Sequence, residues 1–321
     1  GGEAMDNTEQ ALVKVEAVAL AERPRAIREL VGQFIQEQDI SAGSRETYTR
    51  SLRRLVLWLE ETARIERLRE LTREDILSYK EQLAADGLSS YSINSYLAAT
   101  RRLFQWLESR RIFPDITRNI RGMKKARGFR KDCLSPEQIR AALDGLAGSR
   151  LDAMRDYALF NLLARTGLRT IEAARALVGD IRQEAGQPVL LVQGKGRDSK
   201  DDFVLLVPEA LDPIQAYLRA RGHADLEEPL FSSHSDRNAG EALTTRSISR
   251  IVKQALRRAG LDSSRLTAHS LRHTAITLAL RGGASLQQAQ AMARHADPKT
   301  TMIYSHNISR VAEGAERCIR F

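Results

Sequence analysis

The sequence contains few cysteine, proline, glycine and aromatic residues. Cys133 and Cys318 are its two cysteines, too few for a disulfide framework or a zinc site with four thiolates. With 8 prolines, 20 glycines, 28% charged and 42% hydrophobic residues, the composition is that of an ordinary globular protein and excludes a fibrous or disordered chain. Its 321 residues leave room for two domains, each with its own core.

The sequence has no long hydrophobic run, and its N-terminal residues do not predict a signal sequence. The longest apolar runs are short, such as Phe203 to Val207, whereas a membrane span needs about 18 residues. The N-terminal residues are acidic and polar, and the mildly apolar stretch from Ala11 to Ala21 carries Lys14 and Glu16. We therefore expect no membrane association and a cytoplasmic location.

Basic residues outnumber acidic ones. The 50 Lys and Arg residues against 41 Asp and Glu residues give a formal net charge of +9, which favours nucleic acid as the partner. The excess is densest from Ile116 to Lys131, where seven basic residues occur without an acidic one. This segment is either a solvated interdomain linker or one that follows a DNA backbone, because like charges repel unless phosphates neutralise them.

The apolar pattern predicts a fold that is mainly α with a small antiparallel β-sheet. Helical spacing persists up to about Phe113 and predicts four helices, in which Trp58 and Trp106 are expected to pack in a core rather than stack on bases. From Leu134 onward, helices surround two strand-like segments, Pro188 to Val192 and Phe203 to Val207, which flank a polar tip. The predicted division is an N-terminal tail (1–22), a helical domain (23–113), a basic linker (114–133) and a mixed domain (134–321).

Four short motifs in the mixed domain are informative in combination. They are Thr166 to Glu172 with Arg169, Gly194-Lys195-Gly196, His269 to His273 with Arg272, and Arg294-His295 followed by Tyr304. Each motif alone is weak, because each occurs by chance in many chains. In this order they resemble the tyrosine recombinase, or phage integrase, family, whose signature is Arg, Lys, His-x-x-Arg, His or Trp, and Tyr.

The resemblance extends over residues 24–321 and implies a helical core-binding domain, a linker and a catalytic domain. It implies a phosphate clamp of Arg169 and Arg272, a general acid Lys195, assisting His269 and His295, a nucleophile Tyr304, and a cation-orienting Glu172. The sequence departs from the family pattern at Ala293-Arg294, where Leu-Gly is usual. That departure puts the helix turn before the second histidine in question.

The implied chemistry needs neither a metal nor a cofactor. Guanidinium groups hold phosphate with two hydrogen bonds and stay charged, and a tyrosine with a pKa of about 10 needs a nearby base or cations before it can attack. A P-loop is excluded because Lys195 is followed by Gly196. His269 and His273 lack the intervening Glu of a zinc helix, so we expect His273 to cap or pack. Lys200 is the alternative to Lys195 as general acid.

Several polar residues are candidates for DNA contact, with solvent exposure as the alternative for each. They are Arg45, Tyr48, Asn94, Arg101 and Arg102 in the first domain, and Thr244, Arg246, Arg250 and Lys253 on one helix face in the second. The resemblance implies a C-shaped clamp around double-stranded DNA, closed by Lys124, Lys125 and Arg127. It also implies that the apolar stripe of a helix at 308–320 inserts into a neighbouring protomer, which makes a cyclic homotetramer on two DNA sites.

The leading hypothesis is a site-specific DNA recombinase that works through a 3′-phosphotyrosyl intermediate and a Holliday junction. Integration and excision of a mobile element is the preferred role, and Xer-like dimer resolution is the alternative. A type IB topoisomerase-like nicking and closing enzyme shares the chemistry, and a DNA-binding regulator without activity remains a third hypothesis. Exchange between two sites distinguishes recombination from relaxation of one.

Overall fold

The computed structural model describes residues 26–62, 70–124, 133–194, 198–222, 225–304 and 318–319. The chain divides into two compact units, residues 1–128 and 129–321. Each unit buries its own set of apolar side chains. None of the helices in the described ranges combines the length and the apolar character that crossing a bilayer requires.

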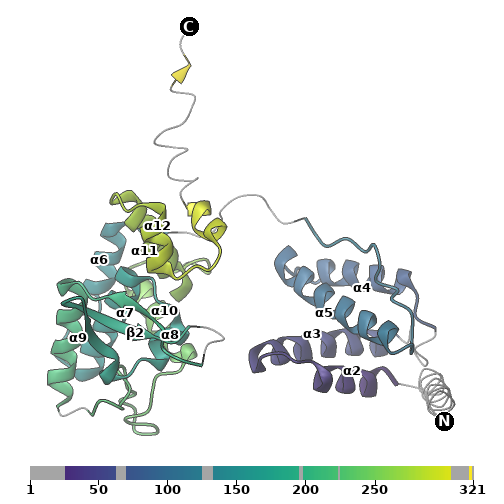
Figure 1. Ribbon diagram of the computed structural model, residues 1–321, viewed down its shortest axis with the longest axis horizontal. Coiled ribbons are helices and arrows are strands. Elements are labelled where there is room, and N and C mark those ends of the chain that lie inside the picture. Colours follow the sequence, from purple (N-terminus) through teal and green to yellow (C-terminus); the bar gives the residue numbers. More distant parts are fainter. Residues whose placement is uncertain are drawn as a thin grey trace, which may run out of the picture. The chain divides into compact units, whose positions relative to one another are not determined.

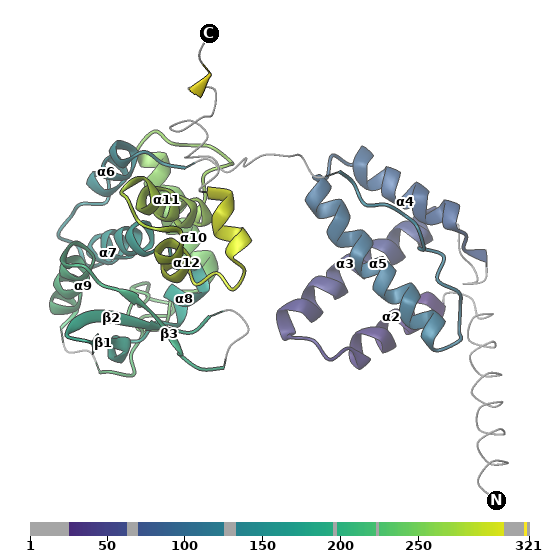
Figure 2. The same cartoon turned by 45° about the horizontal axis from the view of Figure 1, so that its top comes forward.

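The described part of the first unit is helical, as the sequence predicts. Its helices are α2 (Ala26–Glu37), α3 (Ala42–Glu61), α4 (Arg73–Ala85) and α5 (Ser90–Ser109) (Figure 1). The predicted start of α4 is confirmed, because Thr72 and Asp75 form a capping box. In Figure 2, α5 lies across α3, and the apolar faces of the four helices form one core.

Both tryptophans pack within this first unit, which confirms the sequence prediction. Trp58 is 9% exposed, and its ring lies 5.3 Å from that of Tyr79. Trp106 packs edge-on against Phe34 at 5.8 Å, and its indole N–H donates to a carboxylate oxygen of Glu37 over 2.8 Å. Each indole therefore contributes to holding two helices together.

The first part of the predicted linker packs on the helices of the first unit. Ile120 is buried in the core, and Ile116 and Met123 pack against it. Three side chains bind the backbone of this segment: Lys80 donates to the carbonyl of Arg121 over 2.8 Å, Arg101 to that of Ile120 over 2.7 Å, and Asn94 exchanges two hydrogen bonds with Met123. Residues 114–124 thus belong structurally to the first unit, although their charge predicts a linker.

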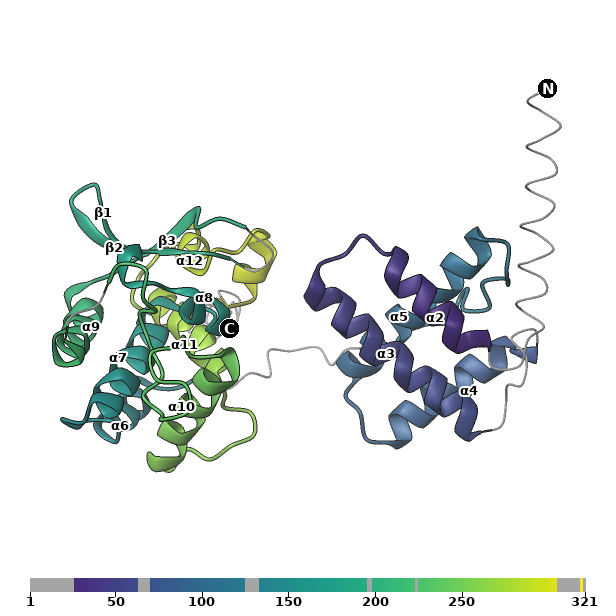
Figure 3. The same cartoon turned by 90° about the horizontal axis from the view of Figure 1, so that it is seen from below.

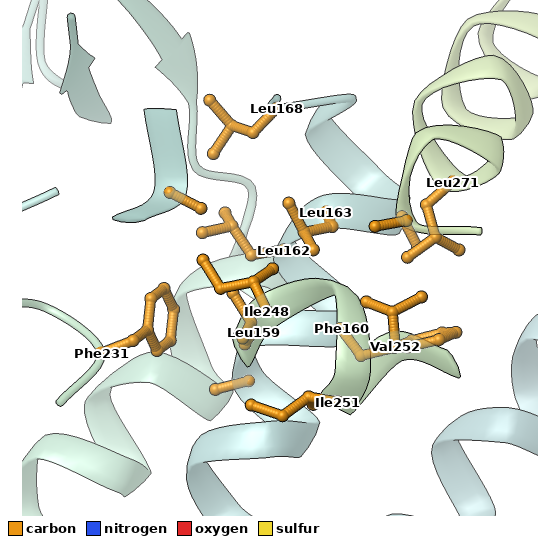
Figure 4. Close-up of a cluster of buried hydrophobic side chains, with 14 of the residues drawn as sticks. Leu159, Phe160, Leu162, Leu163, Leu168, Phe231, Ile248, Ile251, Val252 and Leu271 are labelled. Atoms are coloured by element: carbon orange, nitrogen blue, oxygen red, sulfur yellow. The ribbon is translucent and has the colours of Figure 1, made fainter. Parts of the chain in front are cut away.

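The helices of the second unit pack around α7 (Leu151–Thr166). The unit's helices are α6 (Pro136–Asp144), α7, α8 (Thr170–Arg175), α9 (Pro208–Arg221), α10 (Thr245–Arg258), α11 (Ala268–Arg281) and α12 (Leu286–Ala293), with a 3₁₀ turn, η2 (Val178–Asp180). Side chains of α7, α10 and α11 interdigitate in the core, including Phe160, Val252 and Leu271 (Figure 4). This packing fixes the C-terminal end of α7 against the middle of α11.

A small antiparallel sheet covers one edge of the second unit (Figure 3). The predicted hairpin is confirmed as β2 (Gln187–Val192) paired with β3 (Asp202–Leu205), with Leu190 opposite Val204. A third strand, β1 (Ile181–Glu184), is additional to the prediction and pairs with β2. Ala185 and Gly186 join β1 and β2 with φ values of 47° and 75°, the tight turn in which both residues are left-handed.

Candidate active site

Arg169 lies at a helix start that α7 positions. α7 ends at Thr166 and is capped by Gly167, which adopts a left-handed φ of 64°, and Arg169 is the N-cap of α8. Glu172, in the first turn of α8, accepts the backbone N–H of Arg169 over 2.7 Å and its guanidinium Nη1 over 3.1 Å. The Glu172 side chain is fully buried, whereas that of Arg169 is 32% exposed. The carboxylate therefore holds the arginine from the inside of the unit.

Arg272 ties three segments together from the middle of α11. It is 2% exposed, its Nη1 donates to the carbonyl of Gly167 over 2.6 Å, and its Nη2 donates to the carbonyl of Ala293. Burial, and then the charges of Arg169 and Arg294, lower its pKa to about 10. Arg272 is still a cation at neutral pH, and its electrostatic coupling to the other guanidinium groups places them in one site.

His295 follows the last turn of α12. Its Nδ1 lies 2.8 Å from the hydroxyl of Thr301, and its ring is 6.4 Å from that of Tyr304, nearly parallel to it. Burial is the first cause, and the charges of Arg272 and Arg169 the next, that lower the pKa of His295 to about 4. The imidazole is therefore neutral at pH 7 and carries one N–H donor.

Tyr304 is buried in a helical segment whose described residues are 298–304. Its side chain is 5% exposed, and its hydroxyl contacts Nδ1 of His273, whose ring centroid lies 5.2 Å away. Burial raises the pKa of Tyr304 to about 12, although the charge of Arg272 opposes this rise. The phenol is neutral at pH 7 and needs a base to become a nucleophile.

The structure thus brings together five of the six predicted catalytic residues. His269 is exposed, and its ring packs edge-on against that of His273 at 4.6 Å, next to the phenol. Lys195 lies outside the described residues. The alternative lysine, Lys200, donates to a carboxylate oxygen of Asp180 over 2.5 Å and is thus part of an ion pair.

Two residues of the site were not predicted from the sequence as parts of it. His273 does pack, as expected, but it packs against the phenol of Tyr304, and no sequence spacing links these two positions. Arg294 donates through Nε and Nη2 to the carboxylate of Glu172, over 3.3 and 2.7 Å. The one signal for Arg294 was its departure from the family pattern.

Some of the candidate DNA contacts are exposed to solvent, and others form hydrogen bonds within the protein. Arg102, Lys124, Arg246 and Arg250 are exposed, and Tyr48 is half-buried. Polar atoms of Arg45, Asn94, Arg101 and Lys253 donate to backbone carbonyls, and Thr244 caps α10. Arg250 borders a polar cleft of about 680 Å³ beside α10. Lys125, Arg127 and most of the helix predicted at 308–320 lie outside the described residues.

No metal centre is formed by the residues that the structure describes, since no three of their His, Cys, Asp or Glu side chains group closely enough to hold an ion. The chain matches the model of the Phage integrase family over residues 132–310, which is more than half of its length. It belongs to the phage integrase family. Residues 27–111 match the family's N-terminal SAM-like domain.

Curated tyrosine recombinases resemble this family member over most of their length. "Tyrosine recombinase XerD" of Halalkalibacterium halodurans is 29% identical over 272 residues, which are 84% of this chain and 89% of that protein. The XerD protein of Yersinia pestis is 31% identical over 287 residues, 86% of this chain and 92% of that protein. Like them, this chain is a site-specific DNA recombinase.

Solved structures share its fold. The XerH site-specific recombinase bound to palindromic difH substrate superposes with a TM-score of 0.69 at 23% identity, covering 85% of this chain and 80% of XerH. The Tn1549 transposon integrase in complex with transposon right end DNA gives a TM-score of 0.68 at 16% identity, covering 91% and 98%. The tyrosine recombinase fold is therefore that of this chain.

Proposed function

We propose that this recombinase cuts and rejoins double-stranded DNA through a covalent bond between Tyr304 and the 3′ phosphate. The observation that carries the proposal is the grouping of Arg169, Arg272, His295 and Tyr304, which come from four segments of the second unit, around one cationic site. Cations fixed in a partly buried site stabilise the charge that develops on a phosphate under attack. Clustering of this kind supports phosphoryl transfer.

The proposed step balances without an external energy source. Tyr304 Oη forms a bond to phosphorus, and the bond from phosphorus to the 5′ oxygen of the deoxyribose breaks. The phenol proton passes to the neighbouring imidazole pair, His269 and His273, while Lys195 supplies a proton to the departing 5′ oxygen. The phosphotyrosyl linkage is itself a phosphodiester and keeps the energy of the bond that was broken. A 5′ hydroxyl from another strand can therefore reverse the step and reseal the DNA to a new partner.

The cations and the second histidine have distinct roles in the proposal. Arg169 and Arg272 bind the non-bridging oxygens of the scissile phosphate, and Glu172 orients Arg169. Neutral His295 donates an N–H to the same phosphate, since the nitrogen opposite Nδ1 is turned away from Thr301. The Lys200–Asp180 ion pair favours Lys195 over Lys200 as general acid.

The assembly and biological role are further parts of the proposal. We infer that the chain clamps DNA between its two units with basic groups, and that residues 308–320 insert into a neighbouring protomer to give a homotetramer on two sites. Integration and excision of a mobile element is the proposed role, and the Tn1549 integrase shares the fold. Xer-like dimer resolution is the second candidate, which the matches to XerD proteins favour.

A nicked suicide substrate tests the chemistry. The wild-type chain is expected to leave a protein–DNA adduct that survives denaturant, and Tyr304→Phe is expected to bind the same DNA without forming it. A Tyr304→Phe variant that still forms the adduct would contradict the proposal. Recombination between two sites in one plasmid, scored against relaxation of a one-site plasmid, separates a recombinase from a nicking and closing enzyme.

A further inference from the structure

Arg294 occupies a backbone position that disfavours its side chain. It ends α12 with φ of 53° and ψ of 46°, the left-handed region in which a residue other than glycine is strained. Asn and Asp adopt this region more readily than arginine, because their short side chains form local hydrogen bonds. Something other than backbone preference must therefore stabilise an arginine at this turn.

The side chain of Arg294 is directed into the catalytic site. It is 5% exposed, and Nη1 donates to the carbonyl of Met292 over 2.5 Å. Its Nε and Nη2 form a fork on the two carboxylate oxygens of Glu172, which is fully buried. A bidentate arginine–carboxylate pair is stronger than a neutral hydrogen bond and restricts the geometry of both side chains.

Glu172 is shared between two guanidinium groups. One oxygen accepts Arg294 Nη2 and the backbone N–H of Arg169, and the other accepts Arg294 Nε and Arg169 Nη1. Burial would raise the pKa of Glu172, but the hydrogen bond and charge of Arg294, followed by the interactions with Arg169, hold that pKa below its usual value. The carboxylate is ionised, and a single negative charge faces two positive ones.

We propose that Arg294 is a positioning residue for Arg169 and thereby sets the rate of DNA cleavage. Arg294 binds both carboxylate oxygens of Glu172. Arg169 is therefore oriented by one guanidinium hydrogen bond to Glu172, and its other guanidinium N–H groups are left for the phosphate. Without Arg294, the hydrogen bonds to the buried carboxylate from a guanidinium group come from Arg169, which is then drawn away from the phosphate. This role rests on the proposed function of the site.

The turn contributes a second link to the same site. The residue before Arg294, Ala293, offers its carbonyl to Arg272, and the residue after it is His295. Arg294 thus lies between two groups of the proposed phosphate site while its side chain reaches a third. A glycine would satisfy the backbone at this turn better, so the ion pair with Glu172 is what the arginine adds.

Arg294→Gly separates the side chain from the backbone, because glycine adopts the left-handed turn without strain. Single-turnover cleavage of the suicide substrate at saturating DNA is expected to slow about tenfold or more, the loss typical of a hydrogen-bonded ion pair. The DNA dissociation constant is expected to stay within about threefold, since Arg294 is buried. Arg150→Gly, which removes an exposed ion pair at another helix end, is the matched control and should cleave at the wild-type rate.

The double variant with Glu172→Gln tests whether Arg294 acts through Glu172. It also removes the buried charge that could unfold the single variant. Its cleavage rate is expected to be no lower than that of the slower single variant, whereas multiplied losses would show independent action and overturn the proposal.

Two further outcomes separate this role from the function on which it rests. A wild-type chain that forms an adduct while Arg294→Gly cleaves equally fast at saturating DNA overturns the positioning role alone. A wild-type chain that forms no adduct overturns both proposals together.

Discussion

At the scale of single residues, the site combines groups whose pKa values move away from their usual ranges. His295 has a pKa lowered to about 4 by burial and by the surrounding guanidinium groups, and Tyr304 has one raised to about 12 by burial. Both side chains are uncharged at pH 7. A phosphate that binds beside the guanidinium groups adds negative charge, so DNA binding changes the electrostatics of the site.

The lowered pKa of His295 predicts a pH dependence of stability. Between the folded value of about 4 and the usual value near 6.5, the unfolded chain binds a proton that the folded chain does not. Stability from this group is therefore fully present above about pH 6.5 and is lost as the pH falls toward 4. His295→Gln is expected to show a shallower fall in the free energy of unfolding across this window, measured by urea unfolding at several pH values.

The same two proteins provide the control at higher pH. Between pH 7 and 8, the free energy of unfolding of His295→Gln and of wild type should change with pH by the same slope. Identical slopes for the two proteins between pH 4 and 6.5 would mean that His295 titrates normally in the folded chain.

The residues of the signature could be predicted from the sequence, but two of their neighbours could not. Order and type along the chain selected Arg169, His269, Arg272, His295 and Tyr304, and the fold brings these five side chains together. His273 is a site residue because it contacts Tyr304, which lies 31 positions away in the sequence. Arg294 is one because it binds Glu172, which lies 122 positions away. Spacing on one helix says nothing about such contacts, because they depend on how the helices pack.

At the scale of elements, the C-terminal end of α7 connects the core to the site. Gly167 has a φ of 64°, and a Cβ there would lie 3.4 Å from that of Ala275, on the helix that carries Arg272. Gly167→Ala is expected to cost about 1–2 kcal/mol in backbone strain. It should also slow cleavage, because the carbonyl of Gly167 positions Arg272.

Gly186 provides the matched control for that prediction. It has a φ of 75° in the β1–β2 turn and open space around it. Gly186→Ala should show a similar loss of stability in thermal unfolding while cleavage of the suicide substrate stays at the wild-type rate. If Gly167→Ala cleaves as fast as Gly186→Ala, the link between α7 and Arg272 has no catalytic role.

Helix α10 offers a second prediction about two neighbouring cations on one polar face. Arg250 is exposed, whereas the ammonium of Lys253 donates to the carbonyls of Ser263 and Leu266 and lies 3.5 Å from Asp262. Arg250→Ala is expected to lower the slope of log affinity against log salt by about one, as loss of one phosphate contact does. Lys253→Ala should lower stability and leave that slope unchanged, measured by fluorescence anisotropy of labelled DNA.

Equal changes in the salt slope for the two variants would contradict this assignment. Such a result would mean that Lys253 leaves its carbonyl partners when DNA binds.

Element prediction from sequence succeeded where residues cap or alternate clearly. Thr72 and Ser135 begin helices as expected, and β2 and β3 pair. β1 was missed because its side chains are polar and mostly exposed, and Ala185-Gly186 is a weak turn signal. The packing of the start of the predicted linker on the first unit was not predicted, since its charges hide the buried Ile120.

At the scale of the whole molecule, the chain has two units with separate cores. If both units clamp DNA as proposed, both contribute to the affinity for DNA. Fragments 1–128 and 129–321 are each expected to fold, because each contains its own buried cluster. Mixed in trans, they should bind DNA about 10²-fold to 10⁴-fold more weakly than the intact chain, since the connection supplies a high effective concentration. Circular dichroism melting and DNA titration measure the two expectations.

A fragment mixture that binds DNA as tightly as the intact chain would show that one unit alone carries the affinity. In that case the proposal that the two units clamp DNA together would be wrong.

The central claim is that the oxygen of Tyr304 becomes bonded to phosphorus. Trypsin cleavage after Lys299 and Arg310 releases a peptide with this tyrosine from the covalent adduct, and tandem mass spectrometry can locate the attached nucleotide within it. We expect the modification on Tyr304, joined through a 3′ phosphate. A nucleotide attached to any other residue of the chain would contradict the account.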